Sequence, residues 1–216
     1  MVNNDLYFAR VVLKYSKHKV AKMARKLEFD KNTALQKAMM LFWEKGFEAS
    51  SMEHLVNAME INRFSIYNSF GDKKRLLILA LEHYRENVLA KLLAPLYADL
   101  SPEKCLENYL DNMGKQLQST AGSLGCFIQR TGQSHISTDP EVSKMLILIL
   151  EELRGALINT ISRARYEKSL QWQYNDEVLA DFILSQIQGL IVLRRATNKK
   201  EFISEQIEIL KKYVLH

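Results

Sequence analysis

A short run of hydrogen-bonding side chains lies between residues 63 and 69. Its outward-facing members are expected to be Arg63, Phe64, Ser65, Tyr67, Asn68 and Ser69. Arginine and asparagine can each form paired hydrogen bonds with the edge of a guanine or an adenine, and hydroxyl groups can donate to phosphate oxygens. A face that was only solvated would more often carry Lys and Glu. These residue types therefore predict contacts to a nucleic acid rather than catalysis.

Two short helices are needed to present this run. An apolar stripe at three- and four-residue spacing predicts the first helix, which starts at the capping pattern Ser50–Glu53 and ends near Met59. A turn at Glu60 and Ile61 follows, and Asn62 caps the second helix. The second helix is held on a core by Ile61, Ile66 and Phe70. This is helix-turn-helix geometry, in which the second helix can enter the major groove of DNA.

The whole chain is predicted to be all-α. Three prolines and eight glycines in 216 residues leave few helix breaks, and no segment alternates strictly between apolar and polar residues. About nine helices are expected, the first four short and the later ones long. The long helices are expected over residues 73–93, 102–119, 141–165, 176–195 and 199–214. The pattern predicts a small three-helix unit with a larger helical domain packed directly onto it.

The net charge of +5 is concentrated at the N-terminus. Residues 1–32 hold eight Lys or Arg against three Asp or Glu, so the remaining residues sum to zero. Residues 1–22 carry five basic groups against Asp5, which predicts a basic, disordered extension. Met23 begins a Met-Ala-Arg-Lys run that reads as a second start, and we interpret it as the biological first residue. The nearly neutral body then leaves nucleic-acid binding to local features.

Several classes of protein are excluded by what the sequence lacks. No apolar run approaches the roughly 20 residues of a membrane span, and the N-terminus has no cleavable signal, so we expect a cytoplasmic protein without membrane association. Cys105 and Cys126 are too few for a disulfide framework. The five histidines lack metal-ligand spacing, and Gly-rich phosphate loops are absent. We therefore expect no metal, no cofactor and no enzymatic activity.

Residues 27–84 resemble the DNA-binding domain of the TetR family of transcriptional regulators. The similarity rests on Leu27–Asp30, Ala38–Phe47 and Ile61–Lys73, the last of which contains an aliphatic-Tyr-x-x-Phe run that closes the second helix ahead of the Lys. The resemblance implies a DNA-binding domain over residues 27–87, with its helix-turn-helix at 51–70. It implies that Ser51 caps the first helix of the motif. It also implies phosphate contacts by Ser51, Tyr67 and Lys73 and base contacts by Arg63, Phe64, Ser65 and Asn68.

Helix ends and two departures from the family pattern complete the expected DNA surface. The helix N-termini at Ser51, Asn62 and Asp72 supply backbone donors for phosphate. Glu60 stands in the turn where the family commonly has Gly, and a left-handed backbone there costs of order 1 kcal/mol. Phe64 stands where related members often have Pro. Its ring either presses on a thymine methyl or covers the start of the helix.

Residues 88–216 resemble one branch of the family more loosely, through Gly125–Phe127, Asp139–Val142 and Gln188–Leu190. The resemblance implies an effector-binding and dimerisation domain, whose last two helices form a four-helix bundle with those of a second subunit, and their apolar periodicity agrees. The dimer interface is expected at Phe182, Ile183, Ile187, Leu190, Phe202, Ile207 and Leu210. The effector cavity is expected to include Met113, Cys126, Phe127 and Met145.

Cys126 has two interpretations. It is either an inert buried thiol or, if its thiolate is stabilised, a sensor of electrophiles. No Lys, Arg or His lies within three residues of it on either side, which favours the inert thiol.

The sequence therefore predicts a homodimeric, sequence-specific DNA-binding regulator. It is expected to repress transcription from an operator with an inverted repeat and to be released by a small-molecule effector. The alternative is a helical scaffold or partner-binding protein that keeps the fold but has lost operator recognition. Glu60 and the near-neutral body motivate that alternative.

Overall fold

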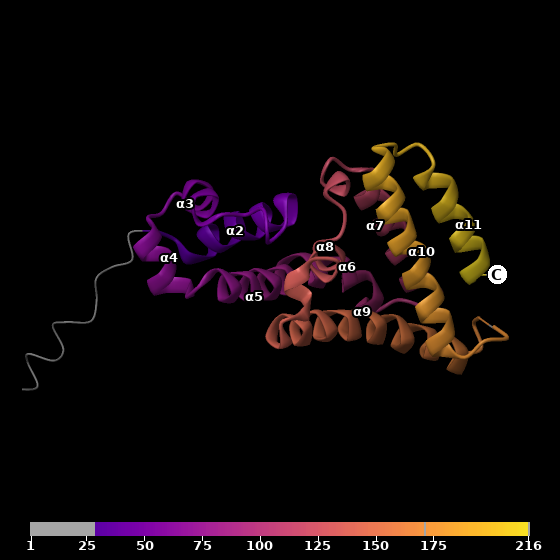
Figure 1. The fold of residues 1–216 in the computed structure, drawn as a ribbon. Coiled ribbons are helices and arrows are strands. Elements are labelled where there is room, and N and C mark those ends of the chain that lie inside the picture. The colour runs from indigo at the N-terminus through magenta and orange to yellow at the C-terminus, as the bar shows by residue number, and fades with distance from the viewer. Residues whose placement is uncertain (1–28, 171, 216) are drawn as a thin grey trace, which may run out of the picture. The chain divides into compact units, whose positions relative to one another are not determined.

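The computed structural model describes residues 29–170 and 172–215, and every regular element in these ranges is a helix (Figure 1). The all-α prediction is confirmed. The chain divides into two units, Met1–Asp30 and Lys31–His216, and the fold described below is that of the second. The expected basic extension at residues 1–22 and the interpretation of Met23 lie outside the described residues.

The elements fall into a group of short helices followed by a group of longer ones. The short helices are α2 (Lys31–Lys45), α3 (Met52–Met59), α4 (Arg63–Phe70) and α5 (Lys73–Tyr84). Next come a π-helical segment η1 (Arg85–Leu89), α6 (Ala90–Leu93), a 3₁₀ turn η2 (Ala94–Tyr97) and α7 (Pro102–Gln118). The remainder are η3 (Ala121–Leu124), α8 (Phe127–Gly132), η4 (His135–Thr138), α9 (Pro140–Tyr166), α10 (Asp176–Thr197) and α11 (Ile203–Leu215).

Within Lys31–His216, helices α2 to α5 pack together as a small group that contains the predicted helix-turn-helix. Helix α2 packs against both α3 and α5, and α4 contacts α3 and α5. The buried face of α2 is apolar and recurs with helical spacing at Ala34, Ala38, Met39, Phe42 and Trp43. Because α2 supplies this shared core, the two helices of the helix-turn-helix are fixed by burial rather than by their own short length.

Helix α5 connects this unit to the larger bundle. It continues through η1 into α6, so the expected helix 73–93 is one rod with a π-helical segment in its middle. Helix α5 also packs against α9. At the N-termini of the two helices, Lys74 Nζ lies 2.7 Å from Glu141 Oε2 and 3.3 Å from Asp139 Oδ2. Movement of the N-terminus of α9 would therefore shift the start of α5 through these ion pairs.

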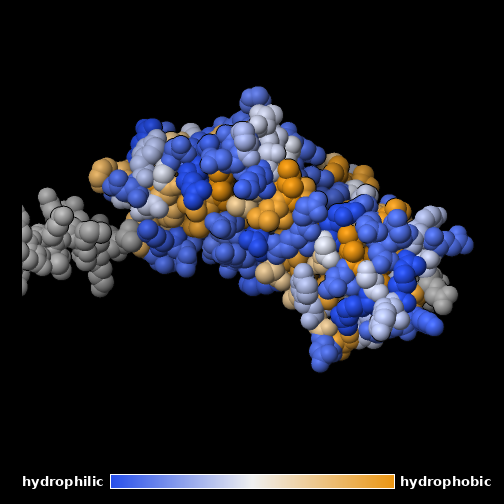
Figure 2. Space-filling view, turned by 90° about the horizontal axis from the view of Figure 1, so that it is seen from below, coloured by the Kyte–Doolittle hydropathy of each residue, from blue (hydrophilic) through white to orange (hydrophobic). Residues whose placement is uncertain are grey.

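The bundle itself pairs α9 with α10 and α7 with α11. Its core consists of apolar side chains such as Leu106, Tyr109, Leu110, Ile149, Leu157 and Ile183. The face on which α9 lies is mostly hydrophilic, with hydrophobic groups between the polar ones (Figure 2). The exposed large aliphatic side chains of α9 are Ile147, Leu148 and Leu150. None of the described helices has the length and hydropathy needed to cross a bilayer.

The start of α3 is capped by Ser51, as the resemblance implies, but the capping box pairs Ser51 with His54 and does not involve Ser50 and Glu53. The Ser50 side chain is buried and donates its Oγ–H to the Gly46 carbonyl at 2.6 Å. The last helix differs from the sequence expectation, because it begins at Ile203 instead of near residue 199. Asn198 ends α10 in the left-handed region at φ 53°, so the chain must turn before α11 can start.

Candidate functional site

The helix-turn-helix is held by side-chain caps at both helix starts. The Ser51 N–H donates to His54 Nδ1 at 3.2 Å while the His54 N–H donates to Ser51 Oγ at 3.1 Å, a reciprocal capping box. Helix α3 ends at Met59, and Asn62 Oδ1 accepts the Ser65 N–H at 2.8 Å to start α4. The predicted turn and second helix are therefore confirmed as structure.

The turn between these helices is made by a residue with a side chain. Glu60 has φ 58° and ψ 33°, the left-handed region that favours glycine, and its N–H donates to the Val56 carbonyl at 3.0 Å. Its carboxylate lies 2.7 Å from Lys37 Nζ on α2. The departure from glycine therefore leaves the turn intact, with strain of about 1 to 2 kcal/mol expected for a left-handed residue with a Cβ.

Helix α4 divides cleanly into an anchored face and an open face. Ile66 is fully buried and Phe70 is 5% exposed, so these two side chains fix the helix on the core. The exposed residues of α4 are Arg63, Phe64, Tyr67 and Asn68, while Ser65 and Ser69 are half-buried. The Arg63 guanidinium carbon lies 5.8 Å from the centroid of the Tyr67 ring, which steadies a long side chain within reach of solvent.

Phe64 is the most unusual member of this face, because its aromatic side chain is 73% exposed. It does not cover the start of the helix. An aromatic ring exposed at this position is available for an apolar contact such as a thymine methyl group in the major groove.

Lys73 and Ser51 sit at two helix N-termini near this face. Lys73 is the first residue of α5, which Asp72 caps by accepting the Arg75 N–H at 2.7 Å. Lys73 Nζ lies 4.2 Å from the centroid of the Phe47 ring. Partial burial lowers the pKa of Lys73, and the nearby Glu48 carboxylate opposes that shift. An ammonium so placed remains charged at neutral pH and is suited to a phosphate oxygen.

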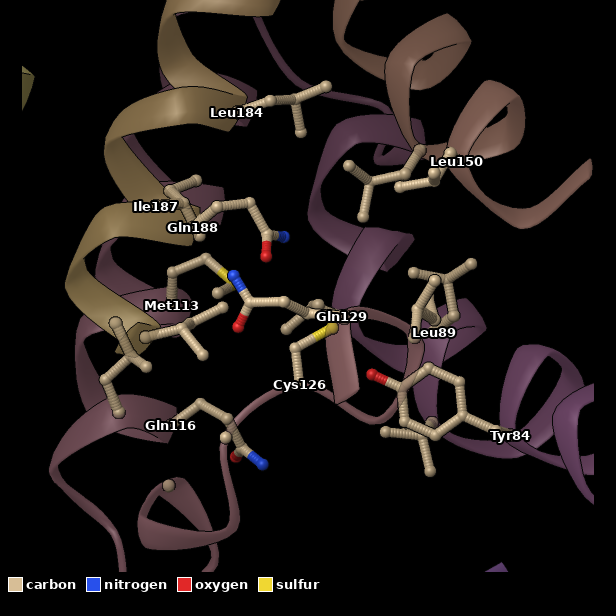
Figure 3. Close-up of a pocket in the computed structure, with 18 of the residues that line it drawn as sticks. Tyr84, Leu89, Met113, Gln116, Cys126, Gln129, Leu150, Leu184, Ile187 and Gln188 are labelled. Atoms are coloured by element: carbon tan, nitrogen blue, oxygen red, sulfur yellow. The ribbon is translucent and has the colours of Figure 1, made fainter. Parts of the chain in front are cut away.

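A second feature is a cavity of about 370 Å³ in the larger bundle (Figure 3). Its volume lies within the range of roughly 300 to 1,000 Å³ that is usual for small-molecule sites. The apolar wall includes Leu89, Met113, Leu146, Leu150, Leu184, Ile187 and Ile191. Trp43 from α2 also lines it, so the group of helices α2 to α5 contributes to one wall of the cavity.

Polar groups meet near the centre of this cavity. Gln129 from α8 and Gln188 from α10 extend towards each other, with the Cys126 thiol and the Tyr84 hydroxyl beside them (Figure 3). Burial raises the pKa of the Cys126 thiol, and hydrogen bonds from backbone N–H groups, Tyr84 and Gln188 only partly offset this. The thiol is therefore protonated at neutral pH, as expected for the inert interpretation and contrary to a poised thiolate.

The predicted effector residues divide into two pairs. Met113 and Cys126 line the cavity. Phe127 does not, because its ring is 1% exposed and packs against both Trp43 and Tyr84, with centroids 6.0 and 5.7 Å away. Met145 does not either, since α9 lines the cavity through Leu146, Leu150 and Leu153.

Several cavity residues were missed from the sequence. They are Trp43, Tyr84, Gln116, Gln129 and Gln188. Gln188 carried a readable signal, because it lies four residues after Leu184 and three before Ile191, two apolar residues of α10 that also line the cavity. Trp43 carried none, since only the tertiary structure brings it to residues more than 80 positions later.

Trp43 connects the cavity to α2, the helix against which α3 and α5 pack. Its Nε1–H donates to the Gly125 carbonyl at 3.1 Å, across 82 positions of sequence. Its ring meets Tyr84 edge-on at a centroid distance of 5.2 Å. The same side chain therefore contributes to the core of α2, lines the cavity and binds the residue that precedes Cys126.

The predicted dimer residues require correction. Ile183, Ile187 and Ile207 are at most 3% exposed in the single subunit, so almost none of their surface is available for contact with a second subunit. They belong to the subunit's own core. Leu190 and Leu210 are also buried, but they line the floor of a small groove between α10 and α11 together with Phe182. Phe202 is half-buried and does not line this groove.

The exposed rim of the groove was not predicted. It contains Gln186, Gln206, Ile209 and Tyr213, with Ile209 59% and Tyr213 49% exposed. Within residues 29–170 and 172–215, no group of three His, Cys, Asp or Glu is arranged to hold a metal ion.

Comparison with known proteins gives a consistent result. The family model for bacterial regulatory proteins of the tetR family matches residues 34–80. The HTH-type transcriptional regulator YezE of Bacillus subtilis (strain 168), itself described as uncharacterized, is 23% identical over 188 residues, 87% of this chain and 97% of YezE. The HTH-type transcriptional repressor ComR of Escherichia coli (strain K12) is 35% identical over 101 residues, 46% of this chain and 48% of ComR.

Solved structures agree in fold. A cysteine mutant of the TetR family transcriptional regulator CifR, in complex with 26-bp double-strand operator DNA, has a TM-score of 0.71 at 27% identity, covering 88% of this chain and 98% of CifR. A TetR-family regulator from Agrobacterium tumefaciens has a TM-score of 0.76 at 18% identity, covering 86% of this chain and 97% of that protein. The second likeness concerns the fold alone.

Proposed function

We propose that this chain, which belongs to the TetR family of transcriptional regulators, represses transcription by binding an inverted-repeat operator as a homodimer and leaves it when a small molecule binds. The observation that carries this proposal is α4. Its apolar side is buried through Ile66 and Phe70, and its opposite side exposes Arg63, Phe64 and Asn68. Such a helix presents hydrogen-bonding and apolar groups together, as major-groove recognition requires.

We assign the individual DNA contacts from where each residue lies, either at a helix N-terminus or on the open face of α4. Arg63, Phe64, Ser65 and Asn68 would contact base edges. Ser51, Asn62, Tyr67 and Lys73 would contact phosphates, which fixes the register of α4 on the duplex. The structure supports these roles through the exposure of α4 and the charge of Lys73 at the start of α5.

The homodimer would form through the groove between α10 and α11. Phe182 and Tyr213 lie with ring centroids 5.0 Å apart beside it, and Ile209 is exposed on its rim. A two-fold axis through this face would place two α4 helices for the two halves of an inverted repeat. Burial of aromatic and aliphatic side chains that are now half exposed would provide the driving force.

Effector release would act through Trp43. A ligand in the cavity touches a wall that includes this α2 side chain and the loop carbonyl of Gly125 to which it is bonded. Displacement of either group changes how α2 sits on the bundle, and with it the placement of α4. The ligand can weaken operator binding only as far as it binds the two arrangements unequally.

We place this activity in the cytoplasm, where a bacterial regulator meets the chromosome. The scaffold alternative has no observation in its favour, because the turn at Glu60 retains its geometry and α4 keeps an open polar face.

Operator binding is tested by selection from randomised duplexes at about 0.15 M salt, where surface charge is well screened. Protein starting at Met1 and protein starting at Met23 should both enrich one inverted repeat. The matched control is the double variant Arg63→Ala, Asn68→Ala, which should enrich the repeat far less because two of the four proposed base contacts are removed. Enrichment by neither wild-type form would contradict the proposal.

Dimerisation is tested by light scattering. Ile209→Asp should give a monomer and Ile147→Asp should leave the dimer intact, because both residues are similarly exposed but only Ile209 borders the groove. A dimer that survives Ile209→Asp and is lost with Ile147→Asp would move the interface to α9.

A further inference from the structure

We propose that the cavity between α7, α8, α9 and α10 binds an uncharged, largely apolar molecule whose single polar group is held by Gln129 and Gln188. This inference rests on the proposed function and adds the chemical class of the effector. It depends on three independent features of the cavity: the absence of charge in its lining, the position of its amides and its enclosure by apolar walls.

The first feature is charge. Among the described residues that line the cavity there is no Asp, Glu, Lys, Arg or His. A carboxylate or ammonium group entering it would lose its water and meet no opposite charge, and that loss is one of the largest penalties in protein interiors. The polar groups present, the amides and the hydroxyl of Tyr84, can solvate a neutral dipole but cannot neutralise an ion.

The second feature is the pair of amides. Within the described part of the chain, the side-chain amide of Gln129 has no protein hydrogen-bond partner, although it points into the centre of the cavity (Figure 3). Gln188 lies opposite, with its side chain near the Cys126 thiol. An amide offers both donors and an acceptor, so this pair suits a ligand group that does the same, such as a carboxamide or a hydroxyl.

The third feature is the shape of the wall. Leu150 and Leu184 stand at one end of the cavity and Gln116 at the other, with the amides between them (Figure 3). Leu150 is 46% exposed, so the cavity reaches the surface at this apolar end. The volume of about 370 Å³ equals that of roughly a dozen liquid waters, enough for one or two fused or linked rings. The apolar part of the ligand would occupy the leucine end and its polar group the centre.

Cys126 lines the cavity, and no Lys, Arg, His, Asp or Glu of the described lining lies there to take the proton from its thiol, so reversible binding is expected. Its thiol lies in the polar centre and is kept neutral by burial. The thiol would make a weak van der Waals contact with the ligand. Cys126→Ala should therefore change the affinity for the probe by no more than about threefold.

The experiment uses the full chain and three scaffolds of increasing size. The probes are benzamide, naphthalene-2-carboxamide and biphenyl-4-carboxamide, each compared with the carboxylate and the aminomethyl cation of the same ring. Affinity is measured by calorimetry at pH 7.5. For at least one scaffold the neutral amide should bind tenfold or more tightly than both ions, because only the ions must be buried without a counter-charge.

Variants locate the binding. Gln129→Leu keeps the side-chain size and removes the amide, and it should weaken the best amide probe about three- to tenfold, as expected for one hydrogen bond. Gln133→Leu is the matched control, because Gln133 is exposed four residues later and does not line this cavity. It should leave probe affinity unchanged. Equal weakening by both variants would remove Gln129 from the site.

The proposal is overturned if a carboxylate or ammonium probe binds as tightly as its amide, or if no neutral probe binds with a Kd below about 1 mM, the limit of weak recognition. Operator affinity measured without probe separates this failure from failure of the proposed function. A protein that enriches an inverted repeat but rejects every neutral probe would keep its role as a regulator and lose only this effector class.

Discussion

Helix α4 and the cavity differ in how far apart along the chain their residues lie. The open face of α4 is made by residues 63–69, one short stretch whose inward side is fixed by Ile66 and Phe70. The cavity is lined by residues of α2, α5, η1, α6, α7, η3, α8, α9 and α10. A substitution on the exposed face of one helix leaves the core unchanged. A substitution in the cavity wall also alters core packing, because the same side chains pack against neighbouring helices. The two regions should therefore respond differently to mutation.

The largest expected effect is at Trp43, which lines the cavity from α2, the helix that packs against α3. Trp43→Ala should lower the free energy of unfolding by about 3 to 5 kcal/mol, the usual cost of removing a large buried aromatic. Trp43→Phe keeps a ring and removes the hydrogen bond to Gly125, so about 1 kcal/mol is expected. Urea unfolding measures both.

Trp172 supplies a matched control for the Trp43 variants. Its Nε1–H also donates to a backbone carbonyl, that of Val214 at 2.9 Å, but it does not line the cavity. Trp172→Phe should cost a similar amount of stability and leave operator affinity unchanged. If Trp43→Phe likewise leaves operator affinity and effector response untouched, Trp43 does not connect the two regions.

Arg63→Ala tests whether α4 can change without cost to the fold. Operator binding should weaken by about 1 to 3 kcal/mol and specificity should relax at one base position. The free energy of unfolding should stay within about 0.5 kcal/mol, because the side chain is exposed. Competition binding on the operator and on single-base variants measures the first effect. Equal losses on every sequence would make Arg63 a phosphate contact.

Lys73→Ala should weaken binding to all duplexes alike. Loss of one phosphate contact should reduce the slope of log K against log salt by about 0.9. Some stability should also be lost, about 0.5 to 1 kcal/mol, because the ammonium lies over the Phe47 ring. Lys91→Ala, an exposed lysine on α6, is the control and should leave the slope as it is. A change in sequence preference would contradict the assignment.

Glu60→Gly tests the strain in the turn. Glycine adopts φ 58° without a steric penalty, so stability should rise by up to about 1 kcal/mol after its greater freedom in the unfolded chain is counted. Loss of the exposed ion pair with Lys37 should lower the stability only slightly, and Lys37→Met measures this loss separately. Thermal unfolding follows both variants. A fall in Tm for Glu60→Gly larger than that for Lys37→Met would show that the left-handed turn carries no strain.

Cys126 gives the smallest effect, on the pH dependence of stability. Burial raises the folded pKa of its thiol above the unfolded value, so the folded state holds the proton more strongly. The contribution to stability is complete below the unfolded thiol pKa and is lost as pH rises towards the folded pKa. Cys126→Ser should make stability less sensitive to pH above the ordinary thiol pKa in urea unfolding. An unchanged pH profile would contradict burial as the cause.

Local residue patterns were enough to predict α4. Asn62 before a run anchored by Ile66 and Phe70 predicts the cap, the direction of the helix and its open face, because all three depend on interactions within one or two turns. The all-α fold and the ends of the longer helices followed for the same reason. The capping box of α3 uses Ser51 and His54 instead of Ser50 and Glu53, because the Ser50 hydroxyl is buried and bonded to Gly46. Helix α11 starts late because Asn198 adopts a left-handed backbone after α10.

The tertiary structure decided which apolar residues face inward, outward or into the cavity. An apolar stripe on α10 shows that the helix is buried on more than one side, but not that Ile183 and Ile187 serve the subunit's core while Ile209 of α11 stays exposed. Likewise the sequence identified Cys126 and Met113 but not Trp43 or Gln129. Periodicity specifies a face of one helix, whereas a cavity exists only where faces of several helices fail to meet.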